Sequence, residues 1–287
     1  MLHRCVIWSV CHFLFGAAWF PLPATSFAQN PADEHVKVEL VSEEDAIVPH
    51  RQLRLGVRFD LRDGWHTYWI NPGDSGEPPR IEWTLPRGFQ ADSIQWPYPT
   101  RLSTPPFVDY GYEHQALLPV VIRTPSGLTE GANEKVIANV RYLICREVCI
   151  PGKKQLILEL PVKDHATASS NAALFESARR QLPKPIPHGW KISATSAGDE
   201  LRLRLRTGRV IASPQFFPLE PEQIENAASQ KLSAAPGGLD LHLKKSNHLL
   251  KPISRIKGVI IVAGTAYLVN ATVVQSSGQG SVQSKQN

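Results

Sequence analysis

Cys145 and Cys149 are the residues of this sequence best suited to chemistry, and they lie four positions apart in the segment YLICREVCIP. Two cysteines can form a disulfide, exchange it with the thiols of another protein, or contribute to a copper or zinc site. Four residues of straight strand span roughly 13 Å, whereas a disulfide requires Cα atoms about 4.4–6.8 Å apart. A turn at residues 146–148 would bring the thiols together, so we expect the pair to cap a hairpin made of residues 135–145 and 149–160.

Such a bond would close a loop of about five residues and would add little stability. The chain-entropy contribution is roughly 2 kcal/mol, against about 4–5 kcal/mol for a loop of about 100 residues. A short bridge in a turn is also easy for another thiol to reach, which favours thiol–disulfide exchange over stapling. A passive hairpin disulfide has the same spacing, and that alternative stays open. Arg146 would stabilise a neighbouring thiolate, and Glu147 would oppose it.

A metal site is the third alternative for the two cysteines. A histidine would have to complete it, and the candidates in the first half of the chain are His35, His50, His66 and His114. None of them has a spacing to the cysteines that is typical of a zinc or copper motif. We therefore predict no metal ligands and no cofactor, while a copper-binding role in metal tolerance stays as an alternative.

The first 28 residues have the regions of an export signal in the expected order. Arg4 gives a basic start, the apolar run CVIWSVCHFLFGAAWF follows, and Ser26 and Ala28 are small residues at positions −3 and −1 of a cleavage site. The run is about one helical turn short of a comfortable membrane span, which argues against an anchor. Cleavage would remove Cys5 and Cys11. In an oxidising compartment such as a bacterial periplasm, the two remaining cysteines would pair unless a metal held them.

The composition indicates a globular protein and argues against nucleic-acid binding. Hydrophobic residues make up 42% and charged residues 20% of the chain, a balance typical of a protein with a packed core. The net charge of +5 is small and scattered, so we expect no nucleic-acid partner. The most apolar later segment, residues 258–269, is too short to span a membrane and is better explained as strands around Gly264.

Short alternating segments dominate the first half of the mature chain and predict a β-sandwich. Each segment is bounded by Gly, Pro, Asn or Asp, and their spacing is typical of such a fold. The predicted strands are residues 35–41, 52–61, 66–70, 80–85, 116–123, 135–144 and 154–162. Residues 31–163 are therefore expected to form one sandwich that carries the cysteine pair.

A helix and a second β-rich region follow this sandwich. Apolar residues at helical spacing between 164 and 182, stopped by Pro183 and Pro185, predict a helix in a linker of residues 164–185. Alternating or apolar segments at 190–195, 201–208, 239–245 and 258–274 predict a second, smaller sandwich at 186–275. Residues 276–287 contain little to bury and are expected to be disordered. The predicted fold class is therefore all-β, with two tandem sandwiches.

Several conspicuous polar and aromatic residues have competing explanations. Asp109 and Glu113 could accept a proton from an attacking thiol, although solvated loop charges are the better explanation. His66 is expected to be packed or exposed rather than catalytic. The tryptophans are expected to fill the core and support loops, and they are Trp65, Trp69, Trp83 and Trp96.

Five segments together resemble the N-terminal periplasmic domain of the disulfide reductase DsbD, and more closely that of its relative ScsB, the suppressor of copper sensitivity protein. They are GWHTYWINPGDSGEPPRIEW (64–83), IQWPYPTRL (94–102), DYGYE (109–113), LLPV (117–120) and YLICREVCIP (142–151). A sixth segment, ASPQFFPLEPEQIENAASQ (212–230), resembles the second half of the ScsB-type periplasmic region. The resemblance covers about residues 35–275.

The resemblance implies immunoglobulin-like sandwiches, a redox-active cysteine pair and a periplasmic location. It also implies that a membrane-embedded DsbD- or ScsB-like partner supplies electrons, which pass to periplasmic thioredoxin-like or disulfide-bonded proteins. By position, Cys145 and Cys149 match the redox pair of the family, and Cys149 would form the mixed disulfide.

Residues 105–112 resemble the cap loop that shields the pair in this family, with Phe107, Asp109 and Tyr110 as the residues that would control access. Tyr68 matches an aromatic position near the site. The sequence differs from DsbD in its shorter C-x3-C spacing and in Asp109 before Tyr110, where the narrower family has phenylalanine. It also shows no polytopic membrane domain and no thioredoxin-like domain, so we expect a free-standing version with a separate electron donor. The alternative is a non-catalytic interaction domain with a structural disulfide.

Overall fold

The computed structural model describes residues 30–208, 211 and 213–276. The predicted export signal at 1–28 and the predicted disordered tail from residue 277 onward lie outside the described residues. Strands make up most of the described chain, and α1 (Ala172–Gln181) is the one α-helix within it. The predicted all-β class is therefore confirmed. No helix within the described ranges is long and apolar enough to cross a membrane.

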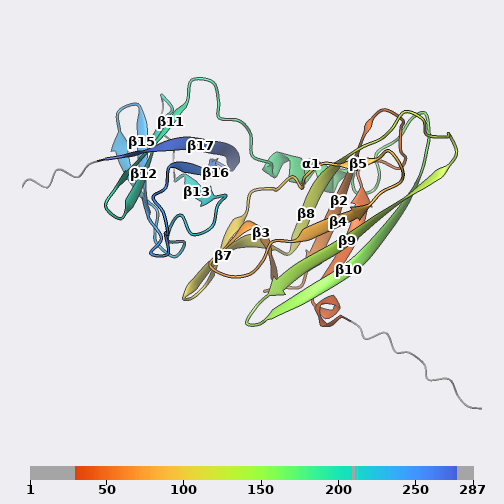
Figure 1. Ribbon diagram of the computed structural model, residues 1–287, viewed down its shortest axis with the longest axis horizontal. Coiled ribbons are helices and arrows are strands. Elements are labelled where there is room, and N and C mark those ends of the chain that lie inside the picture. The colour runs from red at the N-terminus through yellow and green to blue at the C-terminus, as the bar shows by residue number, and fades with distance from the viewer. Residues whose placement is uncertain (1–29, 209–210, 212, 277–287) are drawn as a thin grey trace, which may run out of the picture.

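Two antiparallel sheets build the N-terminal part of the protein, which we define as residues 30–163 (Figure 1). The first sheet has the spatial order β1 (Val36–Ser42), β2 (Gln52–Leu61), β8 (Gln115–Arg123) and β5 (Gln90–Ala91). The second sheet has the order β10 (Cys149–Pro161), β9 (Asn133–Cys145), β3 (His66–Gly73), β7 (Phe107–Glu113) and β6 (Thr100–Thr104), and β4 (Arg80–Thr84) also pairs with β9. A 3₁₀ turn, η1 (Pro31–Glu34), precedes β1.

The core of the N-terminal part joins side chains from both sheets and follows from alternation in the sequence. In β2 the apolar side chains are buried, while Arg54, Arg58 and Asp60 between them keep partial exposure. Because successive side chains point to opposite faces of a strand, each sheet contributes one apolar face to the core. The four tryptophans are buried in this core or packed against it, as the sequence predicts.

Seven strands of the described chain build the C-terminal part, which we define as residues 186–276. Their spatial order is β13 (Gln215–Pro218), β16 (Arg255–Val262), β17 (Thr265–Gln275), β11 (Lys191–Ala197), β12 (Glu200–Arg206), β15 (Gly238–Lys244) and β14 (Lys231–Ala235). β17 joins two groups of strands, because residues 265–272 pair with β16 whereas residues 273–275 run parallel to β11. A separate cluster of buried apolar side chains fills this part.

The predicted helix between residues 164 and 182 is present as α1. It ends before Pro183, which cannot continue the helical hydrogen-bond pattern. Its buried residues Phe175 and Ala178 pack with Val41 and Leu117 of the N-terminal part. The helix is therefore held on the face of the first sheet.

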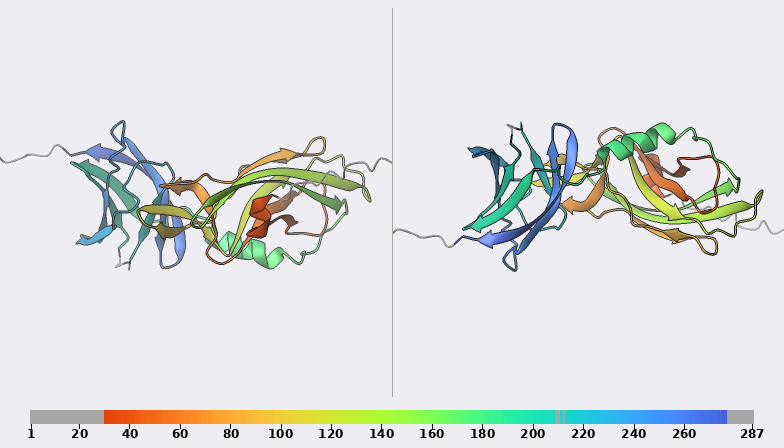
Figure 2. Two further views of the ribbon diagram at one scale, coloured as in Figure 1. Left: turned by 90° about the horizontal axis from the view of Figure 1, so that it is seen from below. Right: turned by 90° about the horizontal axis from the view of Figure 1, so that it is seen from above.

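The two parts meet at β3 and β7 (Figure 2). Phe217 of β13 packs edge-on against Trp69 and Tyr110, with ring centroids 6.4 Å and 5.1 Å away. Nδ2 of Asn71 donates a hydrogen bond of 2.8 Å to the carbonyl oxygen of Pro218. The C-terminal part is thus attached to two strands of the sheet that carries the cysteines.

Residues 107–112, expected to form a loop, instead lie in strand β7. This strand pairs with β6 from Thr104↔Phe107 to Thr100↔Gly111, and Pro105 and Pro106 form the turn. Val108, Tyr110 and Tyr112 alternate along the strand and are buried. Burial of one aromatic face therefore explains why this segment is extended.

Candidate functional site

The disulfide between Cys145 and Cys149 closes the hairpin of β9 and β10. The two residues are directly opposite each other in the antiparallel register, with Cα atoms 4.1 Å apart and a sulfur–sulfur distance of 2.02 Å. Residues 146–148 form the turn, in which the amide of Arg146 donates to the carbonyl oxygen of Val148. The predicted pairing and the predicted hairpin are both confirmed.

The two sulfur-bearing residues differ sharply in exposure. Cys145 ends β9 beneath the surface and is only 3% exposed, whereas Cys149 begins β10 and is exposed. The flanking Arg146 and Glu147 are exposed and pair with each other across 3.0 Å. Cys149 is therefore the cysteine of the pair that borders solvent, while Cys145 is shielded.

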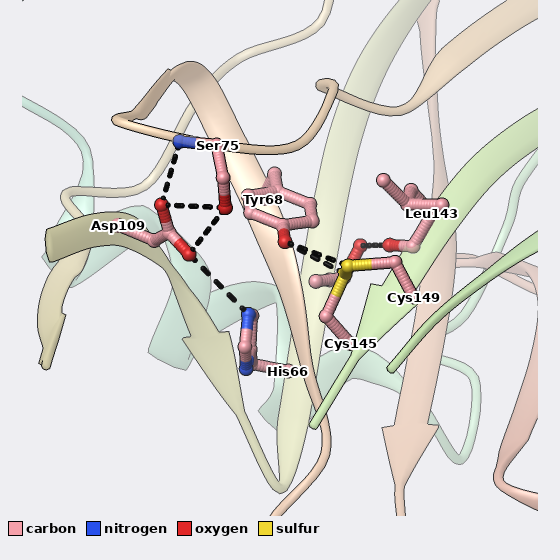
Figure 3. Close-up of a disulfide and its surroundings, with 8 residues drawn as sticks. His66, Tyr68, Ser75, Asp109, Leu143, Cys145 and Cys149 are labelled. Atoms are coloured by element: carbon pink, nitrogen blue, oxygen red, sulfur yellow. Dashed lines mark hydrogen bonds and ion pairs between the residues drawn. A yellow bond between two sulfur atoms is a disulfide. The ribbon is translucent and has the colours of Figure 1, made fainter. Parts of the chain in front are cut away.

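Tyr68 of β3 contacts the buried sulfur directly (Figure 3). Its hydroxyl donates a hydrogen bond to Sγ of Cys145 across 2.8 Å and lies 3.8 Å from Sγ of Cys149. Burial raises the pKa of Tyr68 to about 12, so the hydroxyl keeps its proton at neutral pH. A thiolate accepts such a hydrogen bond more strongly than a disulfide sulfur does. This geometry therefore favours Cys145 as the sulfur that carries negative charge when the bond opens.

Gly76 supports the Tyr68 ring from the chain that follows β3. A Cβ atom added at Gly76 would lie 2.1 Å from Cζ of Tyr68, and Gly76 has a φ of +81°, which other residues rarely adopt. Only glycine fits both constraints. The segment after β3 therefore sets how closely the tyrosine approaches the disulfide.

A polar group made of buried His66 and Asp109 and half-buried Ser75 lies beside Tyr68 (Figure 3). The carboxylate of Asp109 accepts hydrogen bonds from the amide and the hydroxyl of Ser75 at 2.9–3.0 Å. Nε2 of His66 lies 3.9 Å from Oδ2 of Asp109. Burial raises the pKa of Asp109 and lowers the pKa of His66, although their mutual attraction opposes both shifts. The expectation that Asp109 is a solvated loop charge is wrong, because Asp109 lies in β7 and is only 3% exposed.

His66 is the member of this group nearest to the disulfide in the sheet. It is buried, which is one of the two placements expected from the sequence, and it lies opposite Cys145 in the pairing of β3 with β9. Its ring meets Tyr68 edge-on at 5.2 Å. Glu113, the other candidate proton acceptor, is exposed at the end of β7.

The structure separates the four predicted access residues. Tyr68 touches the disulfide. Asp109 contacts His66, which lies beside Tyr68. Phe107 is 50% exposed at the β6–β7 turn. Tyr110 points to the opposite face of β7 from Asp109, where its hydroxyl donates to Oδ1 of Asn226. Ser75 and Gly76 were not predicted as site residues, although they lie in the turn-rich end of the segment 64–83 that carries the family resemblance.

A groove of about 650 Å³ runs beside the disulfide hairpin. Its walls come from the segment after β3 and from the two hairpin strands, and its lining includes Gly76, Arg80, Tyr142, Leu143, Pro151 and Lys153. Leu143 and Pro151 are paired two positions from the cysteines on each strand. The approach to Cys149 therefore borders a concave surface with exposed cations.

No group of three or more His, Cys, Asp and Glu side chains within the described ranges is arranged to hold a metal ion. Two of the histidines considered as possible ligands contact different residues. His35 stacks on Trp65 at 4.1 Å, and His114 lies 3.4 Å from Asp63 at the surface.

Comparison with known proteins adds to this geometry. Residues 37–161 match the family described as "Thiol:disulfide interchange protein DsbD, N-terminal". This part of the chain is therefore similar to the N-terminal domain of DsbD. Its disulfide supports thiol–disulfide exchange as its general chemistry. A search of the curated proteins gave no match.

Two solved structures are among those similar to this chain. The N-terminal periplasmic domain of ScsB from Proteus mirabilis is 18% identical, covers 86% of this chain and 96% of that chain, and has a TM-score of 0.65. The likeness in fold thus includes both parts of the protein. The N-terminal domain of DsbD from Neisseria meningitidis, in the reduced form, is 14% identical and covers 49% of this chain and 94% of that chain, with a TM-score of 0.27.

Proposed function

We propose that this protein is a periplasmic thiol:disulfide oxidoreductase that passes reducing equivalents through Cys145 and Cys149. A membrane-embedded DsbD- or ScsB-like protein would supply the electrons, and periplasmic thioredoxin-like or disulfide-bonded proteins would receive them. The observation that carries the proposal is the asymmetry of the disulfide. One sulfur is open to attack, and the other is buried against a hydroxyl donor that can stabilise it as a leaving thiolate.

Reduction of the protein begins at Cys149. A thiolate of the donor attacks Sγ of Cys149, the bond to Cys145 breaks, and the electron pair of that bond stays on Sγ of Cys145. The hydroxyl of Tyr68 is in place to hydrogen-bond this thiolate. The second donor thiolate then attacks the donor's own sulfur in the mixed disulfide and releases Cys149 as a thiolate. The donor has lost two electrons and this protein has gained two.

Delivery of the electrons follows the same path in the opposite direction. The Cys149 thiolate attacks a disulfide of the recipient, one recipient sulfur leaves as a thiolate, and a mixed disulfide forms. Cys145 then attacks Sγ of Cys149 and expels the second recipient sulfur. The intramolecular disulfide is restored, and the recipient leaves as a dithiol after protonation by solvent.

Trapping of a mixed disulfide tests this function. A Cys145→Ala variant keeps the exposed thiol and lacks the resolving one, so it is expected to form a lasting mixed disulfide with a periplasmic protein that carries a disulfide. A Cys149→Ala variant is the matched control and is expected to trap none. A reduction potential of the wild-type pair below about −300 mV against glutathione would indicate a structural bond instead and would contradict the proposal.

We further propose an architecture of two tandem immunoglobulin-like sandwiches, at residues 31–163 and 186–275, joined by a linker at 164–185 that contains α1. The division is supported by a buried cluster confined to the C-terminal part. The cluster of the N-terminal part includes only Phe217, Val259 and Ala266 from beyond residue 185. The periplasmic location is supported by the ScsB structure, which is that of a periplasmic domain. Export is tested by sequencing the N-terminus of the mature protein, which is expected to begin at Gln29.

Residues 105–112 are proposed to control access to the pair. Phe107 stands exposed at the turn, and Asp109 on the same face of β7 reaches the polar group beside Tyr68. The measurement that tests this role is the rate at which a small thiol reduces the disulfide. Phe107→Ala is expected to raise that rate, and an unchanged rate would remove the access role.

A further inference from the structure

Asn226 is a buried residue of the C-terminal part whose side-chain amide and carbonyl oxygen bind the N-terminal part. It is 5% exposed and lies between β13 and β14. Oδ1 of Asn226 accepts a hydrogen bond of 2.8 Å from the hydroxyl of Tyr110, and Nδ2 donates one of 2.8 Å to Oδ1 of Asp74. Its carbonyl oxygen accepts from Arg101 at 2.5 Å. These partners fix the orientation of the side-chain amide. If the amide were rotated by 180°, its oxygen would face the carboxylate of Asp74, and two hydrogen-bond acceptors would be in contact.

Asp74 passes this attachment to β7. Its second oxygen, Oδ2, accepts a hydrogen bond of 2.8 Å from the amide of Val108, and its own amide donates to the carbonyl oxygen of Val108 at 3.1 Å. Asp74 is therefore held on one side by β7 and on the other by Asn226. These contacts fix the start of the segment that leaves β3.

The next two residues of that segment reach the redox site. Ser75 binds the carboxylate of Asp109 through its amide and hydroxyl, and Gly76 lies directly against the Tyr68 ring. Tyr68 in turn donates to Sγ of Cys145. Three consecutive residues thus connect the amide of Asn226 to the hydroxyl that touches the disulfide.

The register of β3 explains why an external attachment is needed. Tyr68 pairs with Gly111 and Gly73 pairs with Asp109, so residues 69–72 bulge out of the regular ladder between β3 and β7. A bulged segment lacks the ladder hydrogen bonds that hold a regular strand in place. Asn226, together with the contact of Asn71 to Pro218, supplies hydrogen bonds to this region from the C-terminal part.

We infer that Asn226 is a positioning residue through which the C-terminal part holds segment 74–76, and with it Tyr68, in the geometry that sets the redox equilibrium of the disulfide. The inference rests on the proposed function of the cysteine pair and gives the C-terminal part a role in it. Loss of this hold would let Gly76 and Tyr68 move away from Cys145. The thiolate of the reduced state would then lose its hydrogen bond, and the disulfide would become harder to reduce.

The test measures the equilibrium of the full mature chain with reduced and oxidised glutathione at pH 7. Asn226→Asp keeps the volume of the side chain and places a carboxylate against Asp74. It is expected to shift the equilibrium constant at least threefold toward the disulfide, about 14 mV at 29.6 mV per tenfold change. Asn226→Ala removes the contacts without adding charge and is expected to shift it in the same direction, so a failure of the first variant to fold leaves the test intact.

A rescue variant separates hydrogen bonding from loss of packing. In the double variant Asp74→Asn with Asn226→Asp, the new amide at 74 can accept from Val108 and donate to the new carboxylate at 226, which still accepts from Tyr110. All three hydrogen bonds persist, and only the bond between positions 74 and 226 has its donor and acceptor exchanged. This double variant is expected to restore the wild-type equilibrium constant to within twofold, and a shift as large as that of Asn226→Asp would count against the inference.

Two controls decide whether the effect passes through the site. Gln230→Ala removes two hydrogen bonds to the backbone of Phe216 within the C-terminal part, so it should lower stability without changing the redox equilibrium. In a Tyr68→Phe background, Asn226→Asp is expected to cause no further shift, because the hydroxyl it positions is absent. An equal shift in Gln230→Ala, or an additive shift in the Tyr68→Phe background, would overturn the inference.

The proposed function and this inference fail separately. A wild-type potential in the exchange range with no effect of either Asn226 variant overturns the inference and leaves the proposed function standing. A wild-type potential below about −300 mV overturns the proposed function, whereas the shift between the wild type and Asn226→Asp still reports on the positioning role.

Discussion

The hydroxyl of Tyr68 lies 2.8 Å from Sγ of Cys145, a residue 77 positions later in the chain. The contact joins β3 to the end of β9, inside the sheet and away from solvent. It makes the two sulfur atoms of the disulfide chemically different before any partner arrives. The buried sulfur has a donor to stabilise its charge, and the exposed sulfur has access to an incoming thiolate.

Tyr68→Phe removes this donor and leaves the ring in place. A hydrogen bond to a charged group contributes roughly 1.5–3 kcal/mol, which corresponds to about 30–60 mV for a two-electron couple. The reduction potential is therefore expected to fall by that amount, and the pKa of the Cys145 thiol in the reduced protein is expected to rise. Glutathione equilibration and thiolate absorbance near 240 nm, as a function of pH, measure the two effects.

Tyr142→Phe is the control for loss of a buried hydroxyl. Tyr142 lies on β9 next to the same hairpin, is 4% exposed, and its hydroxyl has no hydrogen-bond partner among the described residues. It should leave the potential unchanged. A fall of similar size in both variants would mean that the potential responds to packing and not to the contact with Cys145.

The difference in exposure predicts unequal thiol reactivity. Cys145→Ser leaves the exposed Cys149 as the free thiol, whereas Cys149→Ser leaves Cys145, which is 3% exposed. The first variant is expected to react with an aromatic disulfide reagent at least tenfold faster than the second. In denaturant the two rates should converge, because burial no longer separates them. Equal rates in the folded proteins would contradict the assignment of Cys149 as the attacking residue.

Gly76→Ala tests the support beneath Tyr68. The new methyl would overlap the tyrosine ring, and the backbone φ of +81° would add strain of about 1 kcal/mol. Gly131→Ala is a matched control, because its φ is +82° and no atom lies within 4 Å of an added Cβ. We expect Gly76→Ala to lower the free energy of unfolding by about 1–3 kcal/mol more than the control, which is the usual cost of overpacking. Urea unfolding measures the free energy of unfolding of both variants. Equal losses would show that the Tyr68 ring moves aside without cost.

The hairpin and most strands could be predicted because their signals are local. The alternation in β2 predicts its bounds, residues 52–61, and the spacing of Cys145 and Cys149 predicts their pairing. The strands β5, β6, β13 and β14 are not predicted, because each has only two to five residues. β5 and β13 also pair with strands far along the chain, whereas β6 and β14 form hairpins with the strands that follow them. A loop is also expected where β7 runs, because the turn residues around Pro106 obscure the alternation that follows.

The polar group beside the disulfide could not be predicted from local patterns. Asp109 and Ser75 meet because β3 and β7 pair with a shifted register, which no local pattern specifies. Asn226 lies 152 positions from Asp74. Its segment belongs to the family resemblance at residues 212–230, but it has no alternation that would place Asn226 beside β3. The family resemblance pointed to Tyr68 and Asp109, yet their separate roles depend on which face of each strand is buried.

The buried imidazole of His66 predicts a change of stability with pH. Burial lowers the pKa of His66 in the folded protein, and this effect exceeds the opposing attraction of Asp109 and Glu113. Between that lowered pKa and about 6.5, the unfolded chain binds a proton at His66 that the folded protein does not. The contribution of His66 is therefore present above the unfolded pKa and is lost as the pH falls through this window.

His66→Gln should flatten the dependence of unfolding free energy on pH in that window, by up to about 1.4 kcal/mol per pH unit. Asp109 contributes with the opposite sign, because its pKa is raised in the folded protein and stability therefore falls as the pH rises above the pKa of Asp109 in the unfolded chain. Asp109 is present in both the wild type and His66→Gln. Urea unfolding at pH 5, 6, 7 and 8 measures the difference. His114→Gln, at a ring whose side chain is 75% exposed, is the control and should keep the wild-type slope. A slope in His66→Gln equal to the wild-type slope would show that His66 takes up its proton as readily in the fold as in the unfolded chain.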